Sequence, residues 1–115
     1  MDYMTAQIQD DPYGFIGATL NSNKLGILII TGKDIPLEFY SLASNPSIKK
    51  HAWFGFWKGE TSKDFRKEHH LSYPSLIGFY GLKENPSQFE YSEFKGKHTD
   101  LGKLQFWALE QIQKV

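Results

Sequence analysis

The sequence predicts one α/β domain in which helices flank a mixed sheet of four to five strands. Three observations carry this prediction. Residues 25–31 and 52–57 are apolar runs of the kind found in strands that are covered on both faces. A helix is expected to begin between them at Pro36, so the order strand, helix, strand indicates a parallel βαβ unit. The length of 115 residues suits a single domain.

The N-terminal part of the chain is expected to add one strand before the central ones. Residues 1–14 are polar and should be loose or form a short helix, which leaves residues 15–115 as the single domain. Residues 15–20 form an apolar run that ends at a cluster of turn-forming residues, and this pattern predicts a strand. The next strand is then 25–31.

The helix between the two central strands should run from Pro36 to about Ser44, where Asn45 and Pro46 end it. Proline suits the first turn of a helix because its missing N–H would have no partner there. An apolar stripe on this helix is expected to face the sheet. The stripe consists of Leu37, Tyr40, Leu42 and Ala43.

The second half of the chain predicts a short helix, a hairpin and a final helix. Residues 61–70 begin with a capping pattern and should form the short helix. Residues 75–80 and 88–94 are expected to pair as an antiparallel hairpin around a turn at 83–86. Thr99-Asp100 then caps a helix with an apolar face of helical period. That face consists of Leu101, Leu104, Ala108 and Ile112, widened by Phe106 and Trp107.

The composition argues against several kinds of chemistry. The chain has no cysteine, which excludes disulfides, thiolate nucleophiles and cysteine-based zinc sites. Lys+Arg and Asp+Glu both number 13, so no basic field exists for nucleic acid or anionic lipid. No metal is expected at the four histidines, because the adjacent His69 and His70 would point about 100° apart on a helix, with His51 and His98 elsewhere. We therefore expect no cofactor, no nucleic acid and no membrane contact.

Two short motifs give the order of elements a more specific interpretation. Tyr73-Pro74-Ser75-Leu76 opens the strand after the second predicted helix, and Phe94-Lys95-Gly96 precedes the last helix. Together with the order of elements, they resemble the thioredoxin-like superfamily over residues 15–115. In that family the motif proline is cis, and a Cys-x-x-Cys pair begins the helix after the central strand. The resemblance implies a thioredoxin-like fold with a cis-proline before the fourth strand.

The stretch that corresponds to the redox motif is Lys33-Asp34-Ile35-Pro36-Leu37, and it contains no cysteine. The chain therefore resembles the non-catalytic, b-type domains of protein disulfide isomerase relatives. This resemblance implies a redox-inactive domain that is not an enzyme. Such a domain would bind polypeptide or position neighbouring domains in a protein-folding factor or chaperone. The resemblance also implies the endoplasmic reticulum lumen as the compartment. If the resemblance does not hold, the expected compartment is the cytoplasm.

The resemblance implies two candidate surfaces for a polypeptide. The first lies between three loops and would present backbone groups to an extended peptide. Its residues are Asp34, Ile35, Tyr73, Pro74, Lys95 and Gly96. The second is an apolar pocket between helices, with Phe39, Phe65 and Leu71 as candidates. The alternative is a structural role for Tyr73 and Pro74, and a place in the core for Phe39, Phe65 and Leu71.

Two other functions are compatible with the sequence. One is the N-terminal half of a glutathione-transferase-like enzyme, a family that also carries a cis-proline and is expected to continue into an all-helical domain. The other is a purely structural interaction module. The module differs from the polypeptide-binding domain only in binding no peptide.

Overall fold

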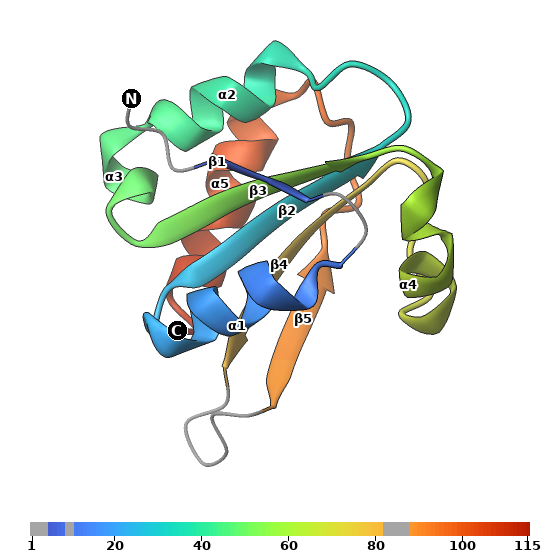
Figure 1. The fold of residues 1–115 in the computed structure, drawn as a ribbon. Coiled ribbons are helices and arrows are strands. Elements are labelled where there is room, and N and C mark those ends of the chain that lie inside the picture. The colour runs from blue at the N-terminus through green and yellow to red at the C-terminus, as the bar shows by residue number, and fades with distance from the viewer. Residues whose placement is uncertain (1–4, 9–10, 82–87) are drawn as a thin grey trace.

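Five strands form one mixed sheet within the residues that the computed structural model describes, which are 5–8, 11–81 and 88–115 (Figure 1). The strands lie in the order β1-β3-β2-β4-β5. They are β1 (Thr5–Ile8), β2 (Leu25–Thr31), β3 (Ala52–Lys58), β4 (Ser75–Gly81) and β5 (Phe89–Glu93). β3 lies between β1 and β2 and is parallel to both, whereas β4 is antiparallel to β2 and to β5. The predicted mixed sheet and its parallel βαβ unit are confirmed.

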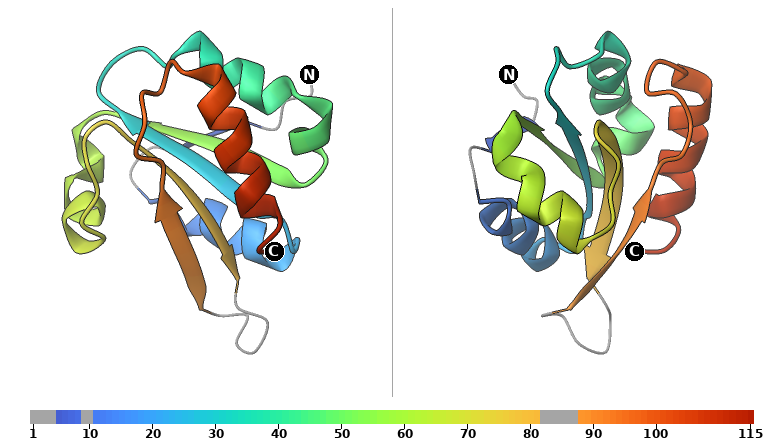
Figure 2. Two further views of the ribbon diagram at one scale, coloured as in Figure 1. Left: turned by 180° about the vertical axis from the view of Figure 1, so that it is seen from behind. Right: turned by 90° about the vertical axis from the view of Figure 1, so that its right-hand side faces the viewer.

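The helices divide between the two faces of the sheet, as the right-hand view of Figure 2 shows. One face carries α1 (Tyr13–Asn21) and α4 (Lys63–Glu68), the latter after a 3-10 turn at Glu60–Ser62. The other face carries α2 (Leu37–Ser44), α3 (Pro46–Lys49) and α5 (Leu101–Ile112). In the described part of the chain, no helix has the length and apolar character needed to cross a bilayer.

Two apolar clusters form the core, one on each face of the sheet. Every residue of β2 is buried, and because successive side chains of a strand point to opposite faces, this strand contributes to both clusters. Leu25, Ile27 and Ile29 pack on the α2, α3 and α5 side. Leu28 and Ile30 pack on the α1 and α4 side. This is the burial that the continuous apolar run predicts for a central strand.

The strand predicted at residues 15–20 is wrong, because this segment lies inside α1. A short apolar run fits a buried strand and a buried helix equally well. In the helix Ile16 and Thr19 are buried, and Thr19 Oγ1 donates a hydrogen bond to Phe15 O at 2.8 Å. Since β1 and β2 are both parallel to β3, the chain must cross over between them, and α1 is that crossover.

The expectation of a loose or helical segment at residues 1–14 also needs correction. Thr5–Ile8 forms β1 and pairs with β3 from Thr5↔Phe54 to Ile8↔Trp57. The sheet thus extends before residue 15. A four-residue strand of mixed polarity has too few positions to show a period of two. The extended conformation of this segment is therefore set by its pairing with β3 rather than indicated by the local sequence.

Two helices bury different residues from those predicted. On α2 the buried side chains are Phe39, Leu42 and Ala43, at positions i, i+3 and i+4. Leu37 is 78% exposed and Tyr40 42% exposed, so neither belongs to the expected stripe. On α5 Phe106 is likewise 67% exposed rather than part of the core face. The bounds of the other predicted elements are confirmed to within a few residues, and the turn predicted at 83–86 lies outside the described residues.

Candidate functional site

The pairing of β2 with β4 brings two of the predicted site loops together. Ile30 pairs with Ser75, so the loop that follows β2 begins beside the loop that precedes β4. Tyr73 packs against this first loop: a Cβ added at Gly32 would lie 2.5 Å from Tyr73 Oη. Glycine at this position therefore leaves room for the Tyr73 ring. The peptide bond between Tyr73 and Pro74 is cis.

Two contacts fix the position of the Tyr73 side chain. Its hydroxyl donates to Gly59 O at 3.3 Å, and the Arg66 guanidinium carbon lies 3.7 Å from the ring centroid. Arg66 is itself oriented by a bond from its Nε to Ser62 Oγ at 2.9 Å. A cation over an aromatic face contributes about 0.5–1 kcal/mol at an exposed site. Tyr73 is therefore held in place although 37% of it is exposed.

The third predicted loop reaches the same end of the sheet through β5. Phe94 N donates to Leu76 O at 2.8 Å, which extends the β4–β5 pairing by one residue beyond Glu93. Lys95 and Gly96 follow at once and therefore lie near the start of β4. The predicted groups at residues 34–35, 73–74 and 95–96 thus meet at one end of the sheet.

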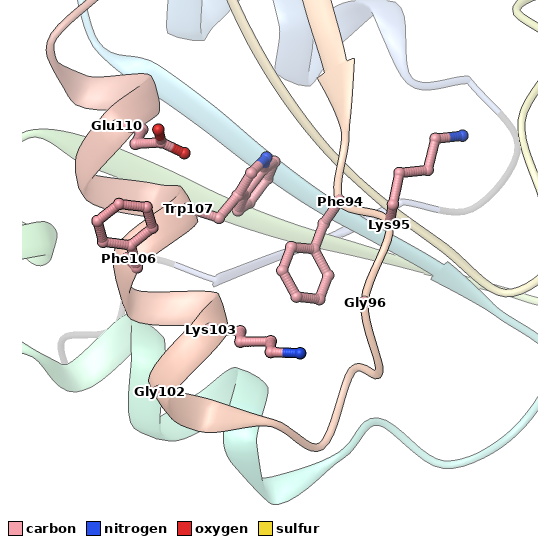
Figure 3. Close-up of a pocket in the computed structure, with 8 residues that line it drawn as sticks. All are labelled: Phe94, Lys95, Gly96, Gly102, Lys103, Phe106, Trp107 and Glu110. Carbon is pink, nitrogen blue, oxygen red and sulfur yellow. The ribbon is translucent and has the colours of Figure 1, made fainter.

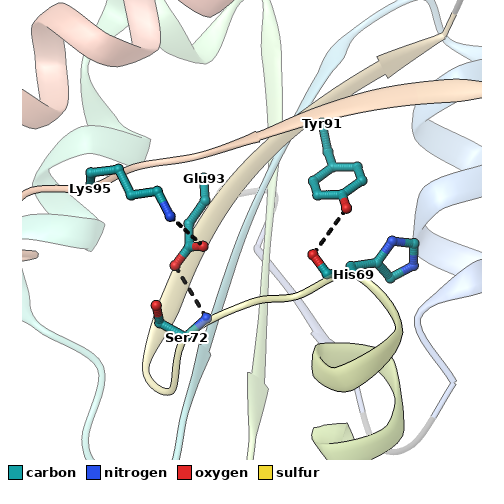
Figure 4. Close-up of polar contacts among 5 residues, drawn as sticks. All are labelled: His69, Ser72, Tyr91, Glu93 and Lys95. Atoms are coloured by element: carbon teal, nitrogen blue, oxygen red, sulfur yellow. Dashed lines mark hydrogen bonds and ion pairs between the residues drawn. The ribbon is translucent and has the colours of Figure 1, made fainter.

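Polar contacts tie the loop before β4 to β5, as Figure 4 shows. Tyr91 Oη donates to His69 O at 3.0 Å, and Ser72 N donates to Glu93 Oε2 at 3.4 Å. Lys95 Nζ lies 3.2 Å from Glu93 Oε1. The Glu93 side chain is only 8% exposed. This carboxylate therefore connects the loop before β4 with the turn after β5.

The remaining groove candidates differ in burial. Asp34 is exposed, and its Oδ1 lies 3.3 Å from Lys58 Nζ. Ile35 is half-buried and packs against the core cluster beneath α2. Pro74 and Gly96 are exposed. The structure thus brings all six groove candidates to one end of the sheet without placing any of them fully in the core.

The second candidate surface does not form. Phe39 is 1% exposed and belongs to the cluster under α2 and α5. Phe65 is 7% exposed and belongs to the cluster on the opposite face, against which Leu71 is partly buried. The sheet separates Phe39 from the other two, so the prediction of one pocket lined by all three is wrong. Their main role is to fill the core.

Leu37 is a further candidate for this surface, although the sequence pattern predicts it in the buried stripe of its helix. It is the first residue of α2, directly after the loop that contains Ile35, and it is 78% exposed. The signal was present in the spacing, because a stripe of Phe39, Leu42 and Ala43 leaves Leu37 on the opposite side of the helix. We define the loop surface as Asp34, Ile35, Leu37, Tyr73, Pro74, Lys95 and Gly96.

The loop surface combines apolar side chains with a few charges and has no thiol. Ile35, Leu37 and Tyr73 supply apolar area, and Lys95 supplies an exposed ammonium group. Near its edge, burial lowers the pKa of His98 below 6.5, an effect that the Glu93 carboxylate partly opposes. No group of three or more metal-ligating side chains occurs in the described ranges. The loop surface therefore offers a ligand apolar area together with two charged side chains, Asp34 and Lys95.

A second feature adjoins the loop surface along α5. An open pocket of about 470 Å³ lies between the turn after β5 and the exposed side of the helix (Figure 3). Its lining is formed by Phe94, Lys95, Gly96, Gly102, Lys103, Phe106, Trp107 and Glu110. Phe94 and Trp107 pack edge to face, with ring centroids 5.5 Å apart. Lys95 and Gly96 are shared by the pocket and the loop surface.

The order of elements, the sheet order and the loop before β4 define a thioredoxin-like fold, and solved structures agree. The chain is similar to human ERp44 in its zinc-bound form, with 17% identity and a TM-score of 0.58. The match covers 96% of this chain and 27% of that one, so the chain spans about a quarter of the ERp44 structure.

Other solved structures match over their whole length. The Trx4 domain of ERdj5 has 10% identity and a TM-score of 0.64, with 99% of this chain and 100% of that one covered. A designed protein has 18% identity and a TM-score of 0.59, with 96% and 98% covered. No protein-family model and no curated protein sequence matches the chain. At these identities, the likeness confirms the predicted thioredoxin-like fold.

Proposed function

We propose that this chain is a redox-inactive thioredoxin-like domain that binds extended polypeptide at the loop surface. The observation that carries the proposal is the exposure of Leu37 and Tyr73, at 78% and 37%, on segments that converge at one end of the sheet. Single exposed apolar residues are common on proteins, but apolar residues gathered on ordered loops are typical of a binding site.

The chemistry of the loop surface suits an unfolded polypeptide better than a small polar ligand. Apolar side chains of the polypeptide would cover Leu37 and Ile35. Its backbone would lie along the exposed edge at Tyr73 and Pro74, in the manner of strand addition. The ammonium group of Lys95, whose side chain is 77% exposed, would favour acidic segments.

Redox inactivity is the second part of the proposal. The sequence contains no cysteine, so it has neither the thiolate that attacks a disulfide nor a second thiol that resolves the mixed disulfide. We expect the pure protein not to accelerate the reduction of insulin by dithiothreitol. Measurable turnover in this turbidity assay would refute this part of the proposal.

A positioning role within a larger folding factor is a second candidate. It is favoured by the ERp44 match, in which the chain corresponds to 27% of a longer protein. Such a domain would require no polypeptide binding at the loop surface. The binding experiment below therefore separates the two functions.

Binding is tested with reduced, carboxymethylated α-lactalbumin, which cannot refold, as a fluorescently labelled probe. We expect Leu37→Ser to weaken binding about tenfold, because burying a leucine side chain contributes about 1.5–3 kcal/mol. Its thermal stability should match the wild type, since Leu37 is 78% exposed. Phe106→Ser, which alters an apolar residue on α5 that is 67% exposed, serves as the control and should bind normally. Equal affinity of the Leu37→Ser and wild-type proteins for the probe would refute the proposed site.

A further inference from the structure

The outer side of α5 has an apolar and charged face with no partner in the described part of the chain. Lys103, Phe106 and Glu110 follow one another at spacings of three and four, so they share one side of the helix (Figure 3). Phe106 is 67% exposed. Among the described residues Glu110 has no ion-pair partner, and Lys103 Nζ reaches only Asp100 Oδ2 at 4.0 Å.

The pocket beside this face contains a helical glycine that the fold does not require. A Cβ added at Gly102 would meet nothing closer than Asp100 Oδ1 at 3.8 Å, and its backbone φ is not in the left-handed region. Glycine weakens a helix relative to alanine. The described residues thus give no steric reason for a glycine at position 102, and its missing side chain widens a pocket whose apolar walls are Phe94 and Trp107.

The charges of this face are arranged so that it complements itself. Lys103 and Glu110 lie symmetrically about the point between Phe106 and Trp107. If a second α5 packs antiparallel about a two-fold axis through that point, Lys103 of each copy faces Glu110 of the other. This reciprocal contact is the defining property of a two-fold interface. A peptide with one sign of charge would satisfy only one of the two residues.

We propose that the chain forms a symmetric homodimer through antiparallel packing of α5 and that the pocket receives Phe106 of the second copy. The phenyl ring then covers Trp107 and Phe94, and both lysine–glutamate pairs close at the rim. The net charge of zero removes long-range repulsion between copies. The inference does not depend on polypeptide binding at the loop surface.

Charge reversal provides the test, with the dimer dissociation constant measured by sedimentation velocity over a range of concentrations. We expect Lys103→Glu and Glu110→Lys each to raise this constant about tenfold, because each places two pairs of like charges opposite one another. The double variant restores both attractions and should dimerise like the wild type. An equimolar mixture of the two single variants should form heterodimers.

Three further variants separate the interface from effects on folding and on peptide binding. Phe106→Ser should abolish the dimer at unchanged thermal stability, since the residue is 67% exposed. Lys63→Glu, on α4 at the opposite face of the sheet, and Leu37→Ser, in the loop surface, should dimerise normally. A wild-type chain that stays monomeric at all concentrations would overturn the proposal. A double charge variant as weak as the two single variants would overturn it as well.

Discussion

Gly26, the second residue of β2, shows how a single residue permits the packing of the sheet. It pairs with Phe79 on β4, and a Cβ at Gly26 would overlap the Phe79 ring, which is fully buried. The ring lies against Gly26 and packs edge to face with Phe15 and Phe89 on its other sides. The absence of a side chain at Gly26 is therefore a requirement of the core.

Gly26→Ala should destabilise the protein by about 1–3 kcal/mol, the usual cost of overpacking a filled core. Urea denaturation monitored by tryptophan fluorescence measures this difference. Gly17→Ala in α1 is the matched control, because nothing lies within 4 Å of the added Cβ. It should leave stability unchanged or raise it by up to about 1 kcal/mol. Equal stability of Gly26→Ala and wild type would contradict the packing.

His98 predicts a dependence of stability on pH. Burial lowers its pKa in the folded protein below 6.5, so the unfolded chain binds more protons just below pH 6.5. Its contribution to stability is therefore complete above pH 6.5 and is lost as the pH falls through 6.5 towards the folded-state pKa. His98→Gln should flatten the decrease of unfolding free energy between pH 7 and 5. A decrease as steep as in the wild type would show that His98 does not cause it.

At the scale of elements, the sequence predicts best where local pattern and tertiary environment agree. The apolar run at residues 25–31 predicts β2 with its observed bounds, because a central strand is buried along its whole length. The apolar run at residues 15–20 is too short for its local pattern to distinguish a strand from a helix. It forms α1 because β1 and β2 are both parallel to β3, so the chain must cross over between them. That information lies in strand pairing, far along the chain.

The candidate site was also predictable only in part. The motif at residues 73–76 identified the loop before β4, and the register of β2 and β5 brings the other two loops beside it. Leu37 was missed because it was assigned to the buried stripe, although the spacing of Phe39, Leu42 and Ala43 places it on the other side of the helix. The prediction of a pocket shared by Phe39 and Phe65 was wrong, because only the topology shows that the sheet lies between these two residues.

The N-terminus of α5 gives a prediction at this scale. Asp100 is its N-cap, and the Oδ1 atom accepts a hydrogen bond from Lys103 N at 3.2 Å. Asp100→Ala should lower the unfolding free energy by about 1 kcal/mol, because it leaves a backbone donor of the first turn without a partner. Asp100→Asn, measured in parallel by urea denaturation, should retain most of that stability. Equal losses in both variants would show that the cap contributes nothing.

At the scale of the whole molecule, the buried core and the proposed functional surfaces occupy different parts of the domain. Two buried clusters cover the faces of the sheet, and the loops that carry exposed apolar residues meet at one end. The proposed dimer face lies along α5, beside that end. One copy can therefore dimerise through α5 and still present Leu37 and Tyr73 to a polypeptide.

The central claim is that polypeptide binds at the loop surface. The most direct test is a titration of the ¹⁵N-labelled protein with reduced, carboxymethylated α-lactalbumin, followed by two-dimensional NMR. We predict that the amide signals of Ile35, Leu37 and Tyr73 shift first and furthest, while those of α1, such as Gly17, stay in place. Unchanged spectra at millimolar probe, or shifts confined to residues outside the loop surface, would contradict the claim.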